Sequence, residues 1–91
     1  MDDIQVVECP EYGIYTETIV DSEKKTLYVT IDASNVTNVY VRVHSRGLSI
    51  FIDEEAFYVD FPEGIVVDPE SVKKTYVNGV VDVTARIVRY P

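Results

Sequence analysis

The side chains that could carry chemistry are few and stand apart along the chain. His44 is the one histidine and Cys9 the one cysteine among 91 residues. A zinc site needs three or four clustered ligands, and neither residue has a second His or Cys nearby. Cys9 precedes Pro10 and lacks a basic neighbour that would favour its thiolate. We therefore interpret His44 as a solvated strand residue and Cys9 as a small apolar one, and we expect no metal site.

Acidic side chains cluster in the run Asp53-Glu54-Glu55, with Asp60 shortly after it. The spacing is not that of a calcium-binding loop. Acid–base catalysis would need a cleft around paired carboxylates, and nothing in the sequence marks one. The chain also has no Gly-x-Ser-x-Gly elbow and no phosphate-binding run among its 4 glycines. We expect a solvated acidic turn, no cofactor and no enzymatic activity.

The elements available to position a site are strands. The chain has 17 Val, 8 Ile and 7 Thr, together with 7 Tyr and 3 Phe. Such side chains suit a pleated sheet. A length of 91 residues with 46% hydrophobic side chains indicates one globular domain over 1–91 with a core of its own. The composition predicts an all-β fold.

Alternation of apolar and polar residues divides the chain into short strands. We expect about seven to eight of them, at Ile4–Glu8, Tyr12–Val20, Leu27–Asp32, Val39–His44, Leu48–Ile52, Ala56–Phe61, Val72–Val77 and along Val81, Val83, Ala85 and Ile87. Asp68-Pro69-Glu70 predicts one short helical turn. Asn78-Gly79 predicts a type I′ hairpin turn. Turns every 8–12 residues are typical of an antiparallel β-sandwich.

The charge excludes several kinds of partner. The 16 acidic and 8 basic side chains give a net charge of −8. Nucleic acids and anionic membranes attract clustered Lys and Arg instead, so we expect neither as a partner. The acidic start of the chain is unlike a signal peptide, and a lone cysteine suits a reducing compartment. We therefore expect a cytoplasmic protein.

Three short motifs in order carry a resemblance to a known family. They are Gly47-Leu48-Ser49-Ile50, then Phe57–Gly64 with its Phe61-Pro62 step, then Tyr76–Val81 with Asn78-Gly79-Val80-Val81. With the two alternating strands before them, residues 12–88 resemble the α-crystallin domain of the small heat-shock (Hsp20) family, whose superfamily includes the p23 and CS domains. The structural positions of these motifs are Leu48, Ile50, Phe61, Pro62, Asn78, Gly79, Val80 and Val81.

The resemblance implies an immunoglobulin-like two-sheet antiparallel β-sandwich that binds partly unfolded proteins without ATP. In the family, a groove between two strands accepts an Ile-x-Ile segment. The matching positions here are Val39, Val41, Val43, Val72, Lys74 and Tyr76. Lys74 replaces the family's alanine, and its ammonium would make apolar docking harder while its stem keeps the charge in water.

The resemblance also bears on assembly. A three-residue turn, Asp53-Glu54-Glu55, replaces the family's longer swapped excursion, and we expect no N-terminal arm and no C-terminal Ile-x-Ile tail. A monomer or dimer is therefore expected rather than a large oligomer. Animal members of the family dimerise through the strand that corresponds to Ala56–Phe61, which makes Ala56, Tyr58 and Asp60 the candidate edge contacts.

Two functional readings stay open. One is a chaperone-related protein that holds unfolded clients, and the other is a p23/CS-like adaptor that docks on one defined partner without holding. Outward aromatic residues at Tyr28, Tyr40, Phe51 and Tyr58 fit either cross-strand packing or a contact surface.

Overall fold

We describe the protein from a computed structural model, which describes residues 3–9, 13–36 and 38–90. Within these ranges the chain forms nine strands and one 3₁₀ turn, which are β1 (Asp3–Cys9), β2 (Ile14–Asp21), β3 (Thr26–Asp32), β4 (Val39–Val43), β5 (Gly47–Ile52), β6 (Glu55–Asp60), β7 (Val66–Val67), η1 (Pro69–Ser71), β8 (Lys73–Val77) and β9 (Val80–Arg89). The prediction of an all-β chain is confirmed.

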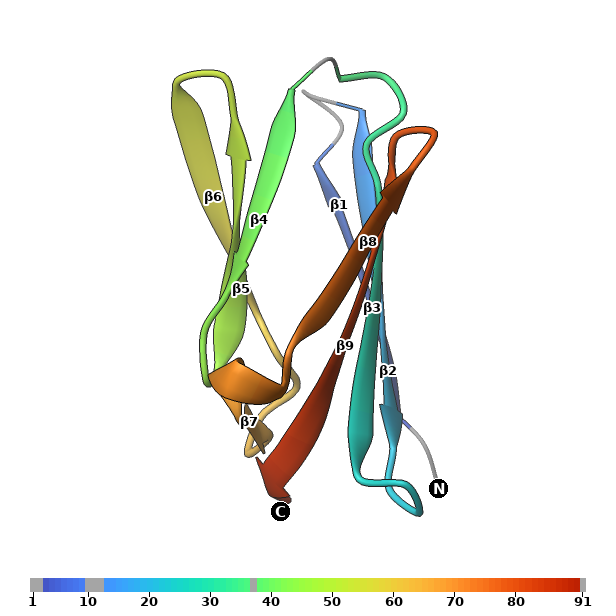
Figure 1. The fold of residues 1–91 in the computed structure, drawn as a ribbon, viewed down its shortest axis with the longest axis vertical. Coiled ribbons are helices and arrows are strands. Elements are labelled where there is room, and N and C mark those ends of the chain that lie inside the picture. Colours follow the sequence, from blue (N-terminus) through green and yellow to red (C-terminus); the bar gives the residue numbers. More distant parts are fainter. Residues whose placement is uncertain (1–2, 10–12, 37, 91) are drawn as a thin grey trace.

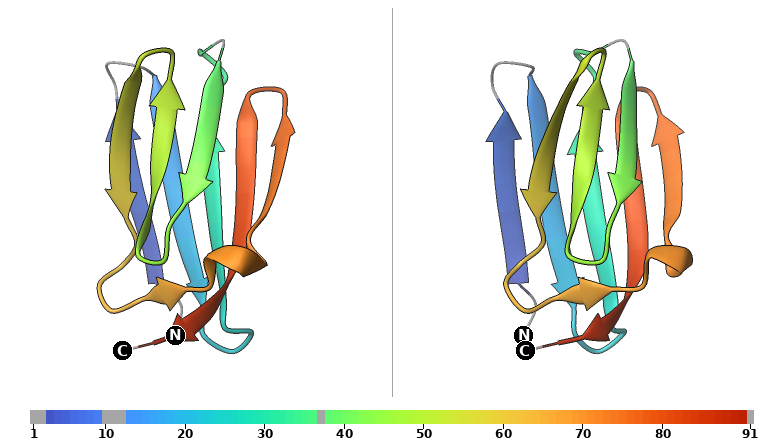
Figure 2. Two further views of the ribbon diagram at one scale, coloured as in Figure 1. Left: turned by 60° about the vertical axis from the view of Figure 1, so that its left-hand side comes forward. Right: turned by 90° about the vertical axis from the view of Figure 1, so that its left-hand side faces the viewer.

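The strands form two antiparallel sheets that face each other (Figures 1 and 2). The larger sheet has the order β1-β2-β3-β9, and the long strand β9 then pairs with β8 along one part and with β7 along another. The smaller sheet has the order β4-β5-β6. The chain crosses between the sheets after β3 and again after β6 (Figure 1). The sheets do not close into a barrel within the described residues.

The core lies between the sheets and is built by the alternation that the sequence shows. Side chains of one parity on each strand point inward, because successive residues of a strand face opposite sides. The fully buried apolar set includes Leu27, Val29 and Ile31 of β3, Leu48 and Ile50 of β5, and Val83 of β9. Each such side chain stabilises the fold by about 1.5–3 kcal/mol relative to exposure.

The turns follow the predicted chemistry. Asp68 caps η1, and its Oδ1 accepts a hydrogen bond of 2.9 Å from the Glu70 amide. Asn78 and Gly79 join β8 to β9 with φ angles of 51° and 81°, the left-handed pair that a type I′ turn requires. Both the helical turn and the hairpin are therefore confirmed.

Several predictions of detail are wrong. β7, the two-residue strand Val66–Val67, was not predicted, because two valines carry no periodicity. The acidic turn has two residues rather than three, since Ile52 pairs with Glu55 and only Asp53 and Glu54 connect the strands. Phe61 is buried but follows the end of β6 instead of belonging to it. The side chain of Cys9 lies outside the described residues.

Candidate functional site

The predicted groove lies between β4 and β8, where an edge of the small sheet faces an edge of the large one (Figure 1). A hollow of about 150 Å³ lies there, lined by Val39, Tyr40, Val41, Lys74, Thr75, Tyr76 and Val81. Four of the six predicted positions thus come together. The other two, Val43 and Val72, are half-buried and pack against the core instead.

Lys74 reaches across this groove. Its Nζ donates a hydrogen bond of 2.7 Å to the backbone carbonyl of Val41 and lies 5.0 Å from the centroid of the Tyr40 ring. We expected the lysine stem to keep the charge in water; the side chain is exposed, and its ammonium in addition contacts the opposite strand. The lysine therefore joins the two sheets across the groove.

The Val41 carbonyl lies on the edge of β4 that has no neighbouring strand among the described residues. Among the described residues, β4 pairs with β5 alone, so its other side has no strand beside it. Backbone groups on an edge strand can pair with an added strand. Here a side chain, not a strand, satisfies the acceptor. A lysine side chain can move away at much lower cost than a strand.

The second open side of the sandwich lies between β6 and β1. Ala56, Tyr58 and Asp60 are exposed on β6, which is the other edge of the small sheet. The Asp60 carbonyl accepts a hydrogen bond of 2.8 Å from Nε2 of Gln5 on β1. Within the described residues, a side chain of the large sheet thus donates to a backbone carbonyl of the small sheet on each open side of the sandwich.

Aromatic side chains occupy the outer face of the small sheet. Tyr40 and Phe51 are directly paired across β4 and β5, with ring centroids 5.9 Å apart. Tyr58 lies on β6, 5.8 Å from the His44 ring. All three are exposed, whereas Tyr28 is half-buried on the large sheet. The cross-strand pairing and the exposed surface that the sequence suggested coexist on this face.

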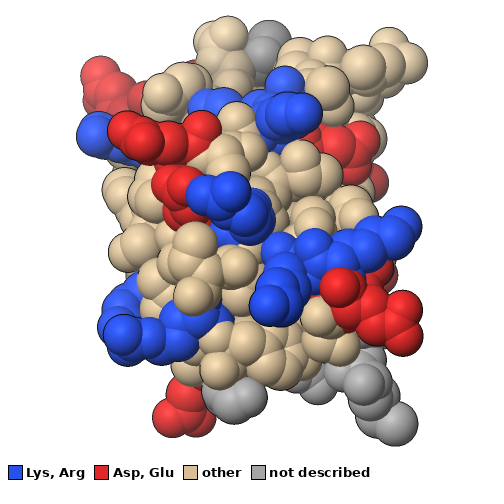
Figure 3. Space-filling model, turned by 60° about the horizontal axis from the view of Figure 1, so that its bottom comes forward, with Lys and Arg blue, Asp and Glu red and all other residues tan. Residues whose placement is uncertain are grey.

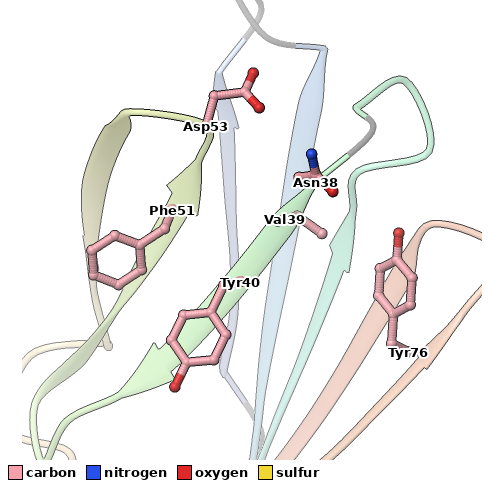
Figure 4. Close-up of a pocket in the computed structure, with 6 residues that line it drawn as sticks. All are labelled: Asn38, Val39, Tyr40, Phe51, Asp53 and Tyr76. Atoms are coloured by element: carbon pink, nitrogen blue, oxygen red, sulfur yellow. The ribbon is translucent and has the colours of Figure 1, made fainter.

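A second and larger hollow continues from the groove toward the β5–β6 turn (Figure 4). It measures about 440 Å³ and is lined by Asn38, Val39, Tyr40, Phe51, Asp53 and Tyr76. The sequence did not predict it, because its residues come from β4, the β5–β6 hairpin and β8. The one signal in the sequence was that Tyr40 and Phe51 occupy outward-facing positions of their alternating strands.

The polar residues form small local contacts. His44 shares a hydrogen bond of 2.9 Å with Ser49 Oγ, and the described residues place no carboxylate on its other ring nitrogen. No group of three or more His, Cys, Asp or Glu side chains in the described part of the chain could hold a metal ion. Hydrogen bonds from the Ser34 hydroxyl and amide lower the pKa of the exposed Asp32 below its ordinary value.

Searches against protein-family models, curated proteins and solved structures gave no match to this chain. In the described residues, no helix has the length and apolar character to cross a bilayer.

Proposed function

We propose that this chain is a protein-binding β-sandwich of the Hsp20/p23 kind, which binds extended polypeptide segments in the groove between β4 and β8. The observation that carries the proposal is the Val41 carbonyl. It lies on a strand edge beside the half-buried Val39 and the buried Val81, and the Lys74 ammonium is its hydrogen-bond donor. An incoming strand could replace that lysine with backbone hydrogen bonds.

The finer assignment to an immunoglobulin-like, α-crystallin-type domain is supported by the order of the strands. β3 pairs with β9, β9 with β8, and β5 lies between β4 and β6. The Asn78-Gly79 turn joins the last two long strands, as the resemblance implies. These features agree with the motif order that suggested the family.

The size of the groove favours a peptide side chain over a small-molecule ligand. Ligand pockets enclose roughly 300–1,000 Å³ and surround most of the molecule that they bind. The space over Val39 and Val81 is about 150 Å³ and lies on an open edge. It suits one or two apolar side chains of a segment whose backbone runs along β4.

Titration with a capped peptide that contains Ile-x-Ile tests the proposal. We expect the wild-type protein to bind it weakly and Lys74→Ala to bind it several-fold more tightly, because the Val41 carbonyl then needs a new donor worth about 0.5–1.5 kcal/mol. Lys74→Met is the matched control for the aliphatic stem. Calorimetry and amide NMR shifts that show no binding by any of the three proteins would contradict the groove.

A heated model client separates the two modes of protein binding. We propose client holding as the first function, in which case aggregation of the client is suppressed. The exposed Tyr40 and Phe51 pair favours a second candidate, an adaptor that docks on one folded partner through this face. Peptide binding without any suppression at stoichiometric excess would support the adaptor and contradict holding.

A further inference from the structure

We infer that the segment bound in the groove is basic, with a Lys or Arg side chain that enters the larger hollow beside Asp53. This inference rests on the proposed function and specifies the chemistry of the partner. Val39, Tyr40 and Tyr76 line both hollows, so a segment seated over Val39 reaches the larger one without a break. The residues around it provide aromatic faces and one carboxylate (Figure 4).

The aromatic side chains of the hollow are available to a ligand. Tyr40 is 59% exposed and Tyr76 54% exposed, and Phe51 stands beside Tyr40. A cation placed over such rings gains roughly 0.5–1 kcal/mol at an exposed site. Tyrosine has few rotatable bonds and is one of the residue types enriched at the hot spots of protein interfaces.

The site already holds a cation of its own chain. The Lys74 ammonium lies over the Tyr40 ring and is held there by the Val41 carbonyl. The edge of β4 thus binds an ammonium group through one aromatic ring, that of Tyr40, and one backbone oxygen, that of Val41. A second cation, brought by a partner, would find the Tyr76 ring and the Asp53 carboxylate among the groups that line the hollow.

The charge around the hollow selects a basic occupant. In the half of the sandwich that contains the β5–β6 and β8–β9 turns, the charged residues that the structure describes are acidic: Glu8, Glu17, Asp32, Asp53, Glu54, Glu55 and Asp82. The Lys74 ammonium comes from the middle of the sandwich and reaches the Tyr40 ring at the border of the hollow. The Lys and Arg residues lie in the middle of the sandwich or toward the other end. Figure 3, which views that end, shows basic side chains spread over the surface among acidic ones. Once the incoming strand has displaced Lys74, the field around the hollow is acidic and favours a basic segment over a neutral or acidic one.

A metal ion does not fit this arrangement, because the described carboxylates do not converge into a ligand set. An extended peptide does fit. It can place backbone groups on the edge of β4, an apolar side chain over Val39 and Val81, and a cationic side chain between Tyr76 and Asp53.

Three capped peptides with one Ile-x-Ile core test the inference. Lys, Gln or Glu flanks the core on both sides, and binding is measured by calorimetry at low and at moderate salt. We expect wild-type protein to bind the Lys peptide about five-fold more tightly than the Gln peptide, and the Glu peptide least. The preference should shrink as salt rises.

Asp53→Asn and Glu63→Gln form a matched pair of variants. Each removes one negative charge, but Glu63 is exposed in the connection between β6 and β7 at the other end of the sandwich. Asp53 has a φ of 52°, a conformation that Asn adopts readily, so the substitution should leave the turn intact. Asp53→Asn should reduce the preference for Lys over Gln to less than about two-fold, whereas Glu63→Gln should preserve it.

The outcomes separate the two proposals. Equal binding of the Lys and Gln peptides would overturn the basic partner and leave the groove in place. Binding of no peptide would overturn both. An equal loss of preference in Asp53→Asn and Glu63→Gln would show a general effect of net charge and overturn the hollow as the site. Tyr76→Leu adds a readout of its own, since it should weaken binding of the Lys peptide more than that of the Gln peptide.

Discussion

Substitution of Gly79 by alanine should destabilise the fold far more than substitution of Gly13, although both glycines have a positive φ. The angles are 81° and 68°, so each alanine incurs the cost of a left-handed conformation, about 1–2 kcal/mol. Alanine also reduces the conformational entropy of the unfolded chain, which stabilises the fold by about 0.4–1 kcal/mol and offsets part of this cost. Gly13→Ala should therefore cost about 1 kcal/mol or less.

Gly79 differs in what its new methyl group would meet. A Cβ there would lie 2.5 Å from the Cα of Ser34, whereas at Gly13 it would lie 3.1 Å from the flexible Asn35 side chain. Relief to an ordinary contact of 3.4 Å needs a shift of about 0.9 Å between two backbones. The Gly79 carbonyl also accepts a hydrogen bond of 2.8 Å from the Ala33 amide. Strain of this bond adds about 0.5–1.5 kcal/mol.

We expect Gly79→Ala to lower the free energy of unfolding by about 2–4 kcal/mol, and Gly79→Val by at least as much. Each kcal/mol corresponds to about 4–8 °C in Tm for a domain of this size. Urea unfolding and thermal melts of the two alanine variants measure the difference. Equal destabilisation of Gly13→Ala and Gly79→Ala would refute the contact with Ser34. An unchanged Tm in both would refute the left-handed turns themselves.

Three further predictions concern the core, a cap and a titration. Ile50→Ala should cost about 2–5 kcal/mol in urea unfolding, because the side chain is fully buried between the sheets; a loss below 1 kcal/mol would contradict that packing. Asp68→Ala should lower the free energy of unfolding by about 0.5–2 kcal/mol because the helical turn loses its cap. Asp68→Asn keeps the cap and loses only the partly exposed ion pair with Arg86, which is worth less than about 1 kcal/mol. Equal losses in the two variants would contradict a stabilising role of the cap. The Asp32 carboxyl carbon, followed by NMR, should titrate below its ordinary pKa and return toward it in Ser34→Ala. Because the pKa of Asp32 is depressed in the folded state, its hydrogen bonds with Ser34 stabilise the fold above the unfolded-state pKa, and this stabilisation is lost as the pH falls through the folded-state pKa. A titration of Asp32 at its ordinary pKa would contradict this contribution.

Local patterns were enough to predict most of the strands. Alternation along 27–32 and 48–52 identified residues that are fully buried, because a strand that packs on one face must place its apolar residues at every second position. Turn chemistry was equally local, as the caps at Asp68 and the Asn78-Gly79 hairpin show. The strand Val66–Val67 escaped prediction because its identity comes from pairing with β9, not from its own residues.

The sites were only partly predictable. The family resemblance predicted that Val39, Val41, Lys74 and Tyr76 share one groove, and these four residues do line it. Nothing in the sequence indicated that the Lys74 ammonium would bind the Val41 carbonyl. The hollow beside Asp53 was missed altogether. Side chains from three separate segments line it, and no periodicity relates them.

By itself, the sequence determined which residues form strands, which face of each strand is apolar and where the chain turns, since these depend on residues within a few positions of one another. Only the tertiary structure decided how the two sheets meet. It placed Gly79 against Ser34, Gln5 on the Asp60 carbonyl and Lys74 on the Val41 carbonyl. It also gathered acidic charge from several separate segments at one end of the sandwich. Such contacts join residues far apart in the chain, and their geometry depends on the packing of the whole core.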